Sequence, residues 1–169
     1  MPSQLVITCS QVMTEQNLTI AFVESATAGR LCSEFSLVPD SGKILMGGLV
    51  CYDACLKEDI LGVPQELIGK YTPESAQVTK ELALRLPKLM KADIYVAVTG
   101  LTTAGGSETP EKPVGTMFVH ACFLDRQISS HDVFKGTPEE IILQTIDLAA
   151  KLVMGELSSF PKAELSVRD

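Results

Sequence analysis

Apolar and polar positions alternate along the chain in a way that predicts helices and strands in succession. Apolar residues recur at helical spacing over residues 3–16, and Ser3 is available as the N-cap of that helix. Short runs rich in β-branched and aromatic residues predict five strands, over 18–23, 44–52, 92–100, 114–124 and 128–134. Helical patterns predict further helices over 30–38, 54–61, 64–68, 72–89 and 137–157.

Local signals refine these predictions. Gly47 and Gly48 inside a strand indicate a bulge or a close approach of another segment. Thr72 followed by Pro73 is typical of a helix start, and Pro87 should kink or disturb the helix that follows.

Strands that alternate with helices favour a largely parallel sheet covered on both faces, and the final hairpin adds antiparallel pairing. We therefore predict an α/β fold, a three-layer α/β/α sandwich with a mixed, mostly parallel five-stranded sheet. Residues 1–160 should form a single domain, and residues 161–169 a frayed tail.

Composition narrows the class of protein. The 169 residues are 46% apolar and 21% charged, which is typical of one globular domain. The formal net charge of −7, without a basic patch, argues against nucleic acid as a partner. No run reaches the ~20 apolar residues that a membrane span needs, and the first residues lack the basic segment of a signal peptide. We expect a soluble cytoplasmic protein.

The cysteines and histidines do not suggest a metal site. Cys51 and Cys55 are four residues apart, but no second pair of ligands completes a tetrahedral zinc site. His120 and His131 lie far along the chain in strand-like surroundings. We expect neither a metal nor another cofactor.

Ser25 lies where a predicted buried strand gives way to a helix. In parallel sheets the ligand crevice lies beyond the carboxyl ends of the strands, and helix N-termini there offer free N–H groups. A serine at such a turn can be a nucleophile, and it is equally a preferred helix N-cap. Position alone leaves both interpretations open.

Tyr52 and Lys57 lie at the end of the second strand and the start of the next helix. No histidine is near in sequence, so a serine nucleophile would need another base. A desolvated lysine can serve because burial lowers its pKa, and a tyrosine can orient or relay a proton. The alternative is a surface lysine that begins a helix and a tyrosine packed at a sheet edge.

A long loop over residues 100–115 is rich in glycine and hydroxyl side chains and carries one lysine. Loops of this length in compact domains are usually functional or mobile. It matches neither the P-loop nor the dinucleotide-binding pattern, so by itself it indicates only that a phosphate could be held there.

Three segments together resemble a known family. They are Glu-Ser-Ala-Thr-Ala-Gly at 24–29, the Gly-Gly…Tyr…Lys…Leu-Gly-Val pattern at 47–63, and Val-Thr-Gly…Thr-Pro-Glu-Lys-Pro-Val-Gly at 98–115. In order and spacing they are similar to the C-terminal domain family of the competence/damage-inducible protein CinA. The resemblance extends from the first predicted helix to the last.

The resemblance implies an α/β/α sandwich and, for enzymatic members, hydrolysis of the carboxamide of nicotinamide mononucleotide to nicotinate mononucleotide and ammonia. It implies a metal-free amidohydrolase with Ser25 as nucleophile, aided by Lys57 and Tyr52. Backbone N–H groups around 26–29 would hold the oxyanion. We expect a small-molecule nucleotide substrate, in a homo-oligomer, in contact with the remaining residues of the predicted site: Ala26, Thr27, Gly29, Thr99, Gly100, Gly105, Gly106, Thr109 and Lys112.

The chain also departs from the family pattern. Ala26 and Ala28 replace the family's Cys and first Gly, and the arginines usual before the last helix are absent from 136–142, which carries Glu139 and Glu140. We therefore expect weak phosphate recognition, resting on Lys112 and its loop rather than on an arginine. The alternative function is a non-catalytic or substrate-altered relative that binds a nucleotide-like ligand.

Overall fold

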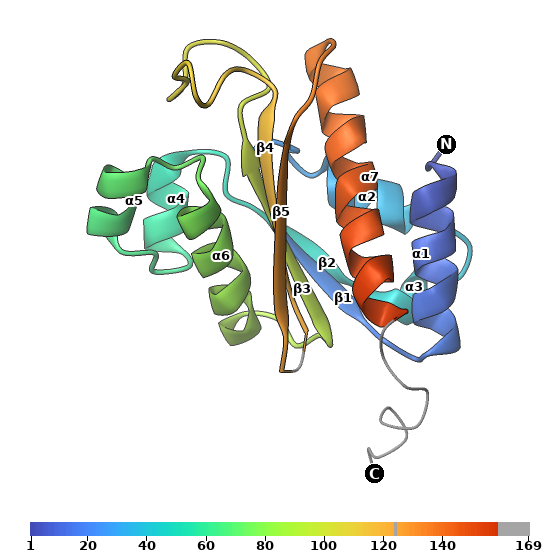
Figure 1. Cartoon of the computed structure of the whole chain (residues 1–169). Coiled ribbons are helices and arrows are strands. Elements are labelled where there is room, and N and C mark those ends of the chain that lie inside the picture. The colour runs from blue at the N-terminus through green and yellow to red at the C-terminus, as the bar shows by residue number, and fades with distance from the viewer. Residues whose placement is uncertain (124, 159–169) are drawn as a thin grey trace.

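The computed structural model describes residues 1–123 and 125–158, and it is built around one five-stranded sheet with helices on both faces (Figure 1). The strands lie in the order β2-β1-β3-β4-β5. Their bounds are Ile20–Glu24 for β1, Leu45–Val50 for β2, Ile94–Gly100 for β3, Thr116–Cys122 for β4 and Gln127–Val133 for β5.

The sheet is mixed. β1 lies between β2 and β3 and pairs with both in parallel, whereas β3 with β4 and β4 with β5 pair antiparallel. The carboxyl ends of β1, β2 and β3 therefore meet at one edge, where a ligand crevice is expected. The predicted α/β/α class with a five-stranded mixed sheet is confirmed.

Helices cover the two faces separately, as Figure 1 shows. One face carries α1 (Gln4–Glu15), α2 (Arg30–Ser36), α3 (Ser41–Ile44) and α7 (Pro138–Leu157). The other carries α4 (Ala54–Asp59), α5 (Gln65–Tyr71) and α6 (Ala76–Arg85), which runs into the 3₁₀ turn η1 (Leu86–Lys88). Ser3 caps α1 as predicted, and the helix containing Pro87 narrows to a 3₁₀ turn there.

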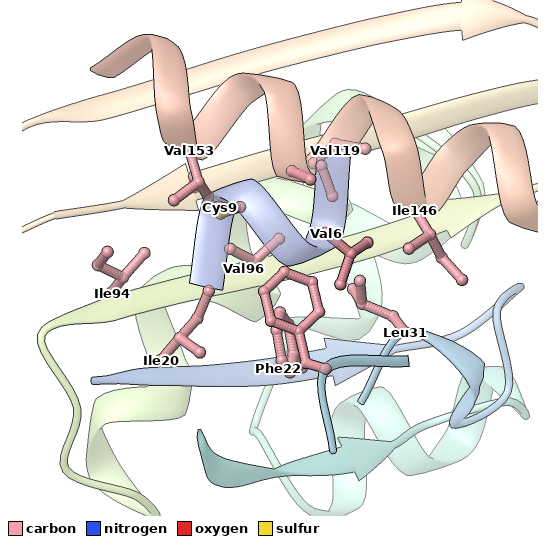
Figure 2. Packing of buried hydrophobic residues seen from close by; sticks show 14 of the residues in the cluster. Val6, Cys9, Ile20, Phe22, Leu31, Ile94, Val96, Val119, Ile146 and Val153 are labelled. Atoms are coloured by element: carbon pink, nitrogen blue, oxygen red, sulfur yellow. The ribbon is translucent and has the colours of Figure 1, made fainter. Parts of the chain in front are cut away.

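Two apolar cores follow from the alternation of side chains along each strand. In β1, Ile20 and Phe22 face α1, α2 and α7, while Ala21 and Val23 face the α6 side. Figure 2 shows Phe22 among the buried residues of the larger cluster, with Val6 of α1 and Ile146 of α7 above β1 in this view. Burial of this kind contributes roughly 1.5–3 kcal/mol for each large apolar side chain.

The glycine pair in β2 has both predicted features. The pairing register of β1 and β2 shifts at Met46, between Leu45 and Gly47. A Cβ built at Gly48 would lie 3.0 Å from Cβ and 3.1 Å from Sγ of Cys32, so α2 packs closely on this strand. A side chain at position 48 would push α2 away from the sheet.

The predicted helix start at Thr72 is wrong. Thr72 has a φ of 69° and ends α5, whereas α6 begins after Ser75, whose hydroxyl accepts the Val78 N–H. The Thr72 hydroxyl accepts a hydrogen bond from Lys112 instead of capping a helix, and residues 73–75 form a bend before α6. The predicted frayed tail at 161–169 lies outside the described residues.

None of the helices within residues 1–123 and 125–158 has the length and apolarity that crossing a membrane would require.

Candidate active site

The turn after β1 holds Ser25 in a fixed place at the carboxyl edge of the sheet. The Ser25 N–H donates to Val98 O of β3 at 3.0 Å, and the Cys51 N–H donates to Glu24 O at 2.8 Å. The hydrogen bonding of the sheet therefore continues one residue beyond the end of β1, toward β3, and one residue beyond the end of β2, toward β1. Ser25 is 5% exposed.

Glu24 connects this turn to α2. Its buried carboxylate accepts the N–H groups of Gly29 at 3.0 Å, Leu31 at 2.9 Å and Cys32 at 2.8 Å. Gly29 is the N-cap residue and has no side chain to offer, so Glu24 replaces the cap from outside the helix. A carboxylate at a helix N-terminus also interacts favourably with the helix dipole.

Ser25 is therefore not the N-cap of α2, so the interpretation of this serine as a helix cap is wrong. Instead, its hydroxyl contacts a lysine: Lys57 Nζ lies 3.1 Å from Ser25 Oγ in a buried hydrogen bond. The same ammonium donates to the carbonyl oxygen of Cys51 at 2.8 Å, with Tyr52 O at 3.5 Å.

Lys57 is fully buried, so it is not a surface lysine. Its helix, α4, starts after Asp53, whose side chain accepts the Cys55 N–H and so fixes where the first turn begins. Burial lowers the pKa of Lys57 from its ordinary value near 10.5, because the protonated amine is poorly solvated there. A lowered pKa makes the neutral amine, which can accept a proton from Ser25, more accessible near neutral pH.

Tyr52 is placed differently from what a proton relay requires. Its side chain is 63% exposed and forms part of a cavity wall. Among the described residues no hydrogen bond joins its hydroxyl to Ser25 or Lys57, and it approaches Lys57 through its backbone carbonyl. A role for the hydroxyl in catalysis therefore requires movement of the side chain.

A cavity of about 240 Å³ opens beside Ser25. Six of the predicted site residues line it, namely Ser25, Ala26, Tyr52, Gly100, Gly105 and Gly106. Five further residues complete the wall: Leu101, Thr102, Thr103 and Ala104, which belong to the loop singled out over 100–115, and Glu74, which the sequence did not indicate. No local pattern marks Glu74, since it enters the wall only because the 101–113 loop packs beside the connection between α5 and α6.

The N–H groups available for an oxyanion are fewer than predicted. The Ala28 N–H donates to Ser25 O, and the Gly29 N–H to Glu24. Within the described part of the chain, the N–H groups of Ala26 and Thr27 make no hydrogen bond. Ala28 has a φ of 49°, a left-handed conformation in which the methyl group costs energy. Ala26 lines the cavity, whereas Thr27 is buried outside its wall.

Lys112 holds the loop rather than facing the cavity. Its ammonium donates to Thr72 Oγ1 at 2.6 Å, Ser107 Oγ at 2.7 Å and Glu74 O at 3.0 Å. An ammonium has three N–H donors, so Lys112 could bind a phosphate only by releasing one of these oxygens. Thr109 pairs its backbone with that of Lys112 and lies outside the cavity wall.

Two other residues of the predicted site are buried. Thr99 is fully buried and shares a hydrogen bond of 2.8 Å with Thr79 of α6. Thr27 is buried, and its hydroxyl has no hydrogen-bond partner among the described residues. Neither lies in the cavity wall.

The two acidic residues in the first turn of α7 have structural partners. Glu140 completes a capping box with Thr137, and its carboxylate has a lowered pKa because Thr137 donates to it. Glu139 lies 3.6 Å from Arg30 Nη1 at the N-terminal end of α2. Both carboxylates therefore stabilise helix starts.

Nothing in residues 1–123 and 125–158 brings together three or more metal-ligating side chains. The five cysteines are free thiols, and burial raises the pKa of Cys9 to about 12 and that of Cys122 to about 11. The thiols of Cys9 and Cys122 behave as buried apolar groups.

Comparison with known proteins agrees with the sequence resemblance. Residues 3–157 match the model of the CinA C-terminal domain. A CinA-like protein of Geotalea uraniireducens is 32% identical over 152 residues, which cover 90% of this chain and 36% of that protein. A CinA-like protein of Thermotoga neapolitana is 40% identical over 109 residues, covering 64% and 26% of the two chains. The chain thus spans about a third of the length of these relatives.

Solved structures show the same fold. The competence damage-inducible protein A of Klebsiella pneumoniae superposes with a TM-score of 0.87 at 21% identity, over 94% of this chain and 98% of that one. The CinA superfamily protein ECK1530/EC0983 of Escherichia coli gives a TM-score of 0.81 at 25% identity, over 89% and 87%. By the match over residues 3–157, the chain belongs to the CinA C-terminal domain family.

Proposed function

We propose that this protein is an amidohydrolase that converts the carboxamide of nicotinamide mononucleotide to a carboxylate and releases ammonia. The observation that carries the proposal is the 3.1 Å contact between Ser25 Oγ and the buried Lys57 Nζ at the wall of a cavity. A serine next to a desolvated amine is an activated nucleophile with its base.

The first half of the reaction transfers the acyl group. Ser25 Oγ attacks the carboxamide carbon while neutral Lys57 takes the hydroxyl proton, so a C–O bond forms and the carbonyl becomes an oxyanion. The N–H group of Ala26, which lines the cavity and makes no hydrogen bond among the described residues, is suited to stabilise that charge. When the tetrahedral intermediate collapses, the C–N bond breaks and the Lys57 ammonium gives its proton to the departing ammonia.

The second half restores the enzyme. Neutral Lys57 removes a proton from water, which attacks the ester carbon, and the C–O bond to Ser25 breaks as the proton passes to Ser25 Oγ. The net change is one amide and one water converted to one carboxylic acid and one ammonia. The Cys51 carbonyl oxygen, 2.8 Å from Nζ, keeps the amine directed toward Ser25 through both halves.

Ammonia release from nicotinamide mononucleotide by the purified protein tests the proposal. Ser25→Ala should abolish release while the free energy of unfolding changes by about 1 kcal/mol or less, because only one hydroxyl contact is lost. Ser33→Ala is the matched control, since this serine of α2 is exposed and should retain full activity.

Ammonia release at the wild-type rate by Ser25→Ala would contradict the serine mechanism. Absence of release by the wild-type protein, together with binding of the nucleotide, would instead favour the alternative of a non-catalytic relative that binds a nucleotide-like ligand.

A further inference from the structure

The described wall of the cavity beside Ser25 contains one acidic residue and no basic one. Among its described residues Glu74 is the only one with a carboxylate, and none has a lysine, arginine or histidine side chain. Behind the wall lie Lys57, which is neutral in the form that acts as base, and Glu24, whose carboxylate caps α2. Glu108 accepts the Gly105 N–H, and Lys112, which donates to Ser107 beside the Glu74 carboxylate, offsets part of the Glu74 charge. Among the described residues of the wall itself, a ligand meets one carboxylate and no cation.

The Glu74 carboxylate is available to a ligand. Its direct partner is the neutral hydroxyl of Ser107, which donates to Oε2. No salt bridge involves Glu74 within residues 1–123 and 125–158, because Lys112 bonds to the Glu74 carbonyl oxygen and to Ser107, not to the carboxylate. The charge is only half-buried, so it does not need an internal counter-ion.

An exposed aromatic ring is the second feature of this wall. Tyr52 is 63% exposed although it is a large apolar side chain, and it lines the same cavity as Glu74. Aromatic faces attract cations, and a carboxylate in the same wall adds to that attraction. Together they form a surface suited to a flat, positively charged ring.

We infer that Glu74 is a specificity-determining residue that selects amides attached to a cationic heteroaromatic ring, with Tyr52 as the stacking surface for that ring. The inference rests on the proposed function. In a nicotinamide nucleoside the ring nitrogen is quaternary and lies meta to the carboxamide. The ring's positive charge therefore enters the cavity with the carboxamide that Ser25 attacks.

The Glu74 carboxylate also affects where the phosphate of a nucleotide can bind. A phosphate group in this cavity would be repelled by Glu74 and would find no basic side chain in the described wall. The phosphate of a nucleotide must therefore lie outside the wall that surrounds the ring, and discrimination inside the cavity depends on the ring charge.

The effect of the ring charge can be measured by ligand binding to the Ser25→Ala protein, because this variant cannot turn the ligand over. The two ligands are nicotinamide riboside, whose ring is cationic, and benzamide riboside, which carries the same carboxamide on a neutral ring. We expect the cationic ligand to bind about five- to tenfold more tightly. Adding Glu74→Gln should reduce this preference to about twofold or less, and should leave the affinity for benzamide riboside nearly unchanged.

Two control variants identify the cause. Ser107→Ala removes the hydroxyl contact to Glu74 but keeps its charge, so the preference should persist. Glu111→Gln removes an exposed carboxylate of the same loop that lies outside the cavity wall, and it should have no effect. If Glu74→Gln fails to fold, the preference can be measured in the Ser25→Ala protein at increasing salt, which should reduce it by screening.

A preference that survives Glu74→Gln, or that does not respond to salt, would overturn the role of Glu74. Ammonia release by the wild-type protein decides the proposed function separately. If the wild-type protein releases ammonia but Glu74→Gln leaves the preference unchanged, the amidohydrolase proposal is supported and only the selection by charge is wrong. Failure of both ligands to bind would overturn the selection, and absence of release from nicotinamide mononucleotide would overturn the activity as well.

Discussion

The carboxylate of Glu24 accepts the N–H of Leu31 at 2.9 Å, across the turn that contains Ser25. The same carboxylate accepts two more N–H groups at the start of α2, those of Gly29 and Cys32. The residue that ends β1 thereby caps α2, and the turn between them is held at both ends. The position of Ser25 consequently depends on its neighbour in the sequence.

Glu24→Gln should destabilise the protein and reduce activity together. An amide keeps one acceptor oxygen, so at least one of the three N–H groups loses its partner. The favourable interaction of the charge with the helix dipole is lost as well. We expect the free energy of unfolding, measured with urea, to fall by about 1–3 kcal/mol. Glu15→Gln makes the same change at an exposed site and should have little effect.

The activity should rise with pH through the pKa of Lys57. The neutral amine is the base, and burial holds its pKa below the ordinary value near 10.5. The rise in kcat/KM for nicotinamide mononucleotide should therefore have its midpoint below pH 10.5. A profile that is flat or falls from about pH 6 to about pH 10 would contradict Lys57 as base.

The same burial makes folding stability depend on pH. Between the lowered pKa and 10.5 the unfolded chain keeps a proton that the folded chain has lost, so the free energy of unfolding rises with pH in that interval. Lys57→Met should remove this part of the slope, as well as the activity, because methionine has no ionisable group. Lys88→Met, at an exposed position, should keep both. Equal slopes in the wild-type protein and Lys57→Met would count against the lowered pKa.

Ala28→Gly should stabilise the protein, contrary to the usual effect of that substitution. Ala28 has a φ of 49°, and relief of left-handed strain, about 1–2 kcal/mol, exceeds the entropy that glycine adds to the unfolded chain. We expect the free energy of unfolding to rise by up to about 1 kcal/mol. Ala76→Gly, at the exposed first residue of α6, should lower it. A decrease for both variants would show that Ala28 is not strained.

Lys112→Met distinguishes loop anchoring from phosphate binding. The ammonium holds Thr72, Ser107 and Glu74 together, so its loss should loosen the cavity wall for every substrate. We expect the KM values for nicotinamide mononucleotide and for its riboside to rise by similar factors. A rise confined to the mononucleotide would show instead that Lys112 binds the phosphate.

The elements of the fold could be predicted from the sequence because they depend on local patterns. Helical spacing, β-branched runs and a cap such as Ser3 act within a few residues, and the structure has these helices and strands close to where they were predicted. The predicted start of α6 was wrong because threonine and serine, at 72 and 75, are both favourable N-cap residues. Only the backbone conformation at Thr72, which the tertiary packing determines, separates them.

The candidate site was indicated by motif, and its geometry was decided by the tertiary structure. Ser25 and Lys57 are 32 residues apart, and they meet because β1 and β2 pair in parallel and end at the same edge of the sheet. Glu74 lies in the cavity wall and Lys112 outside it because two distant loops pack together. Such contacts depend on side chains from far apart in the chain, whose proximity no local spacing encodes.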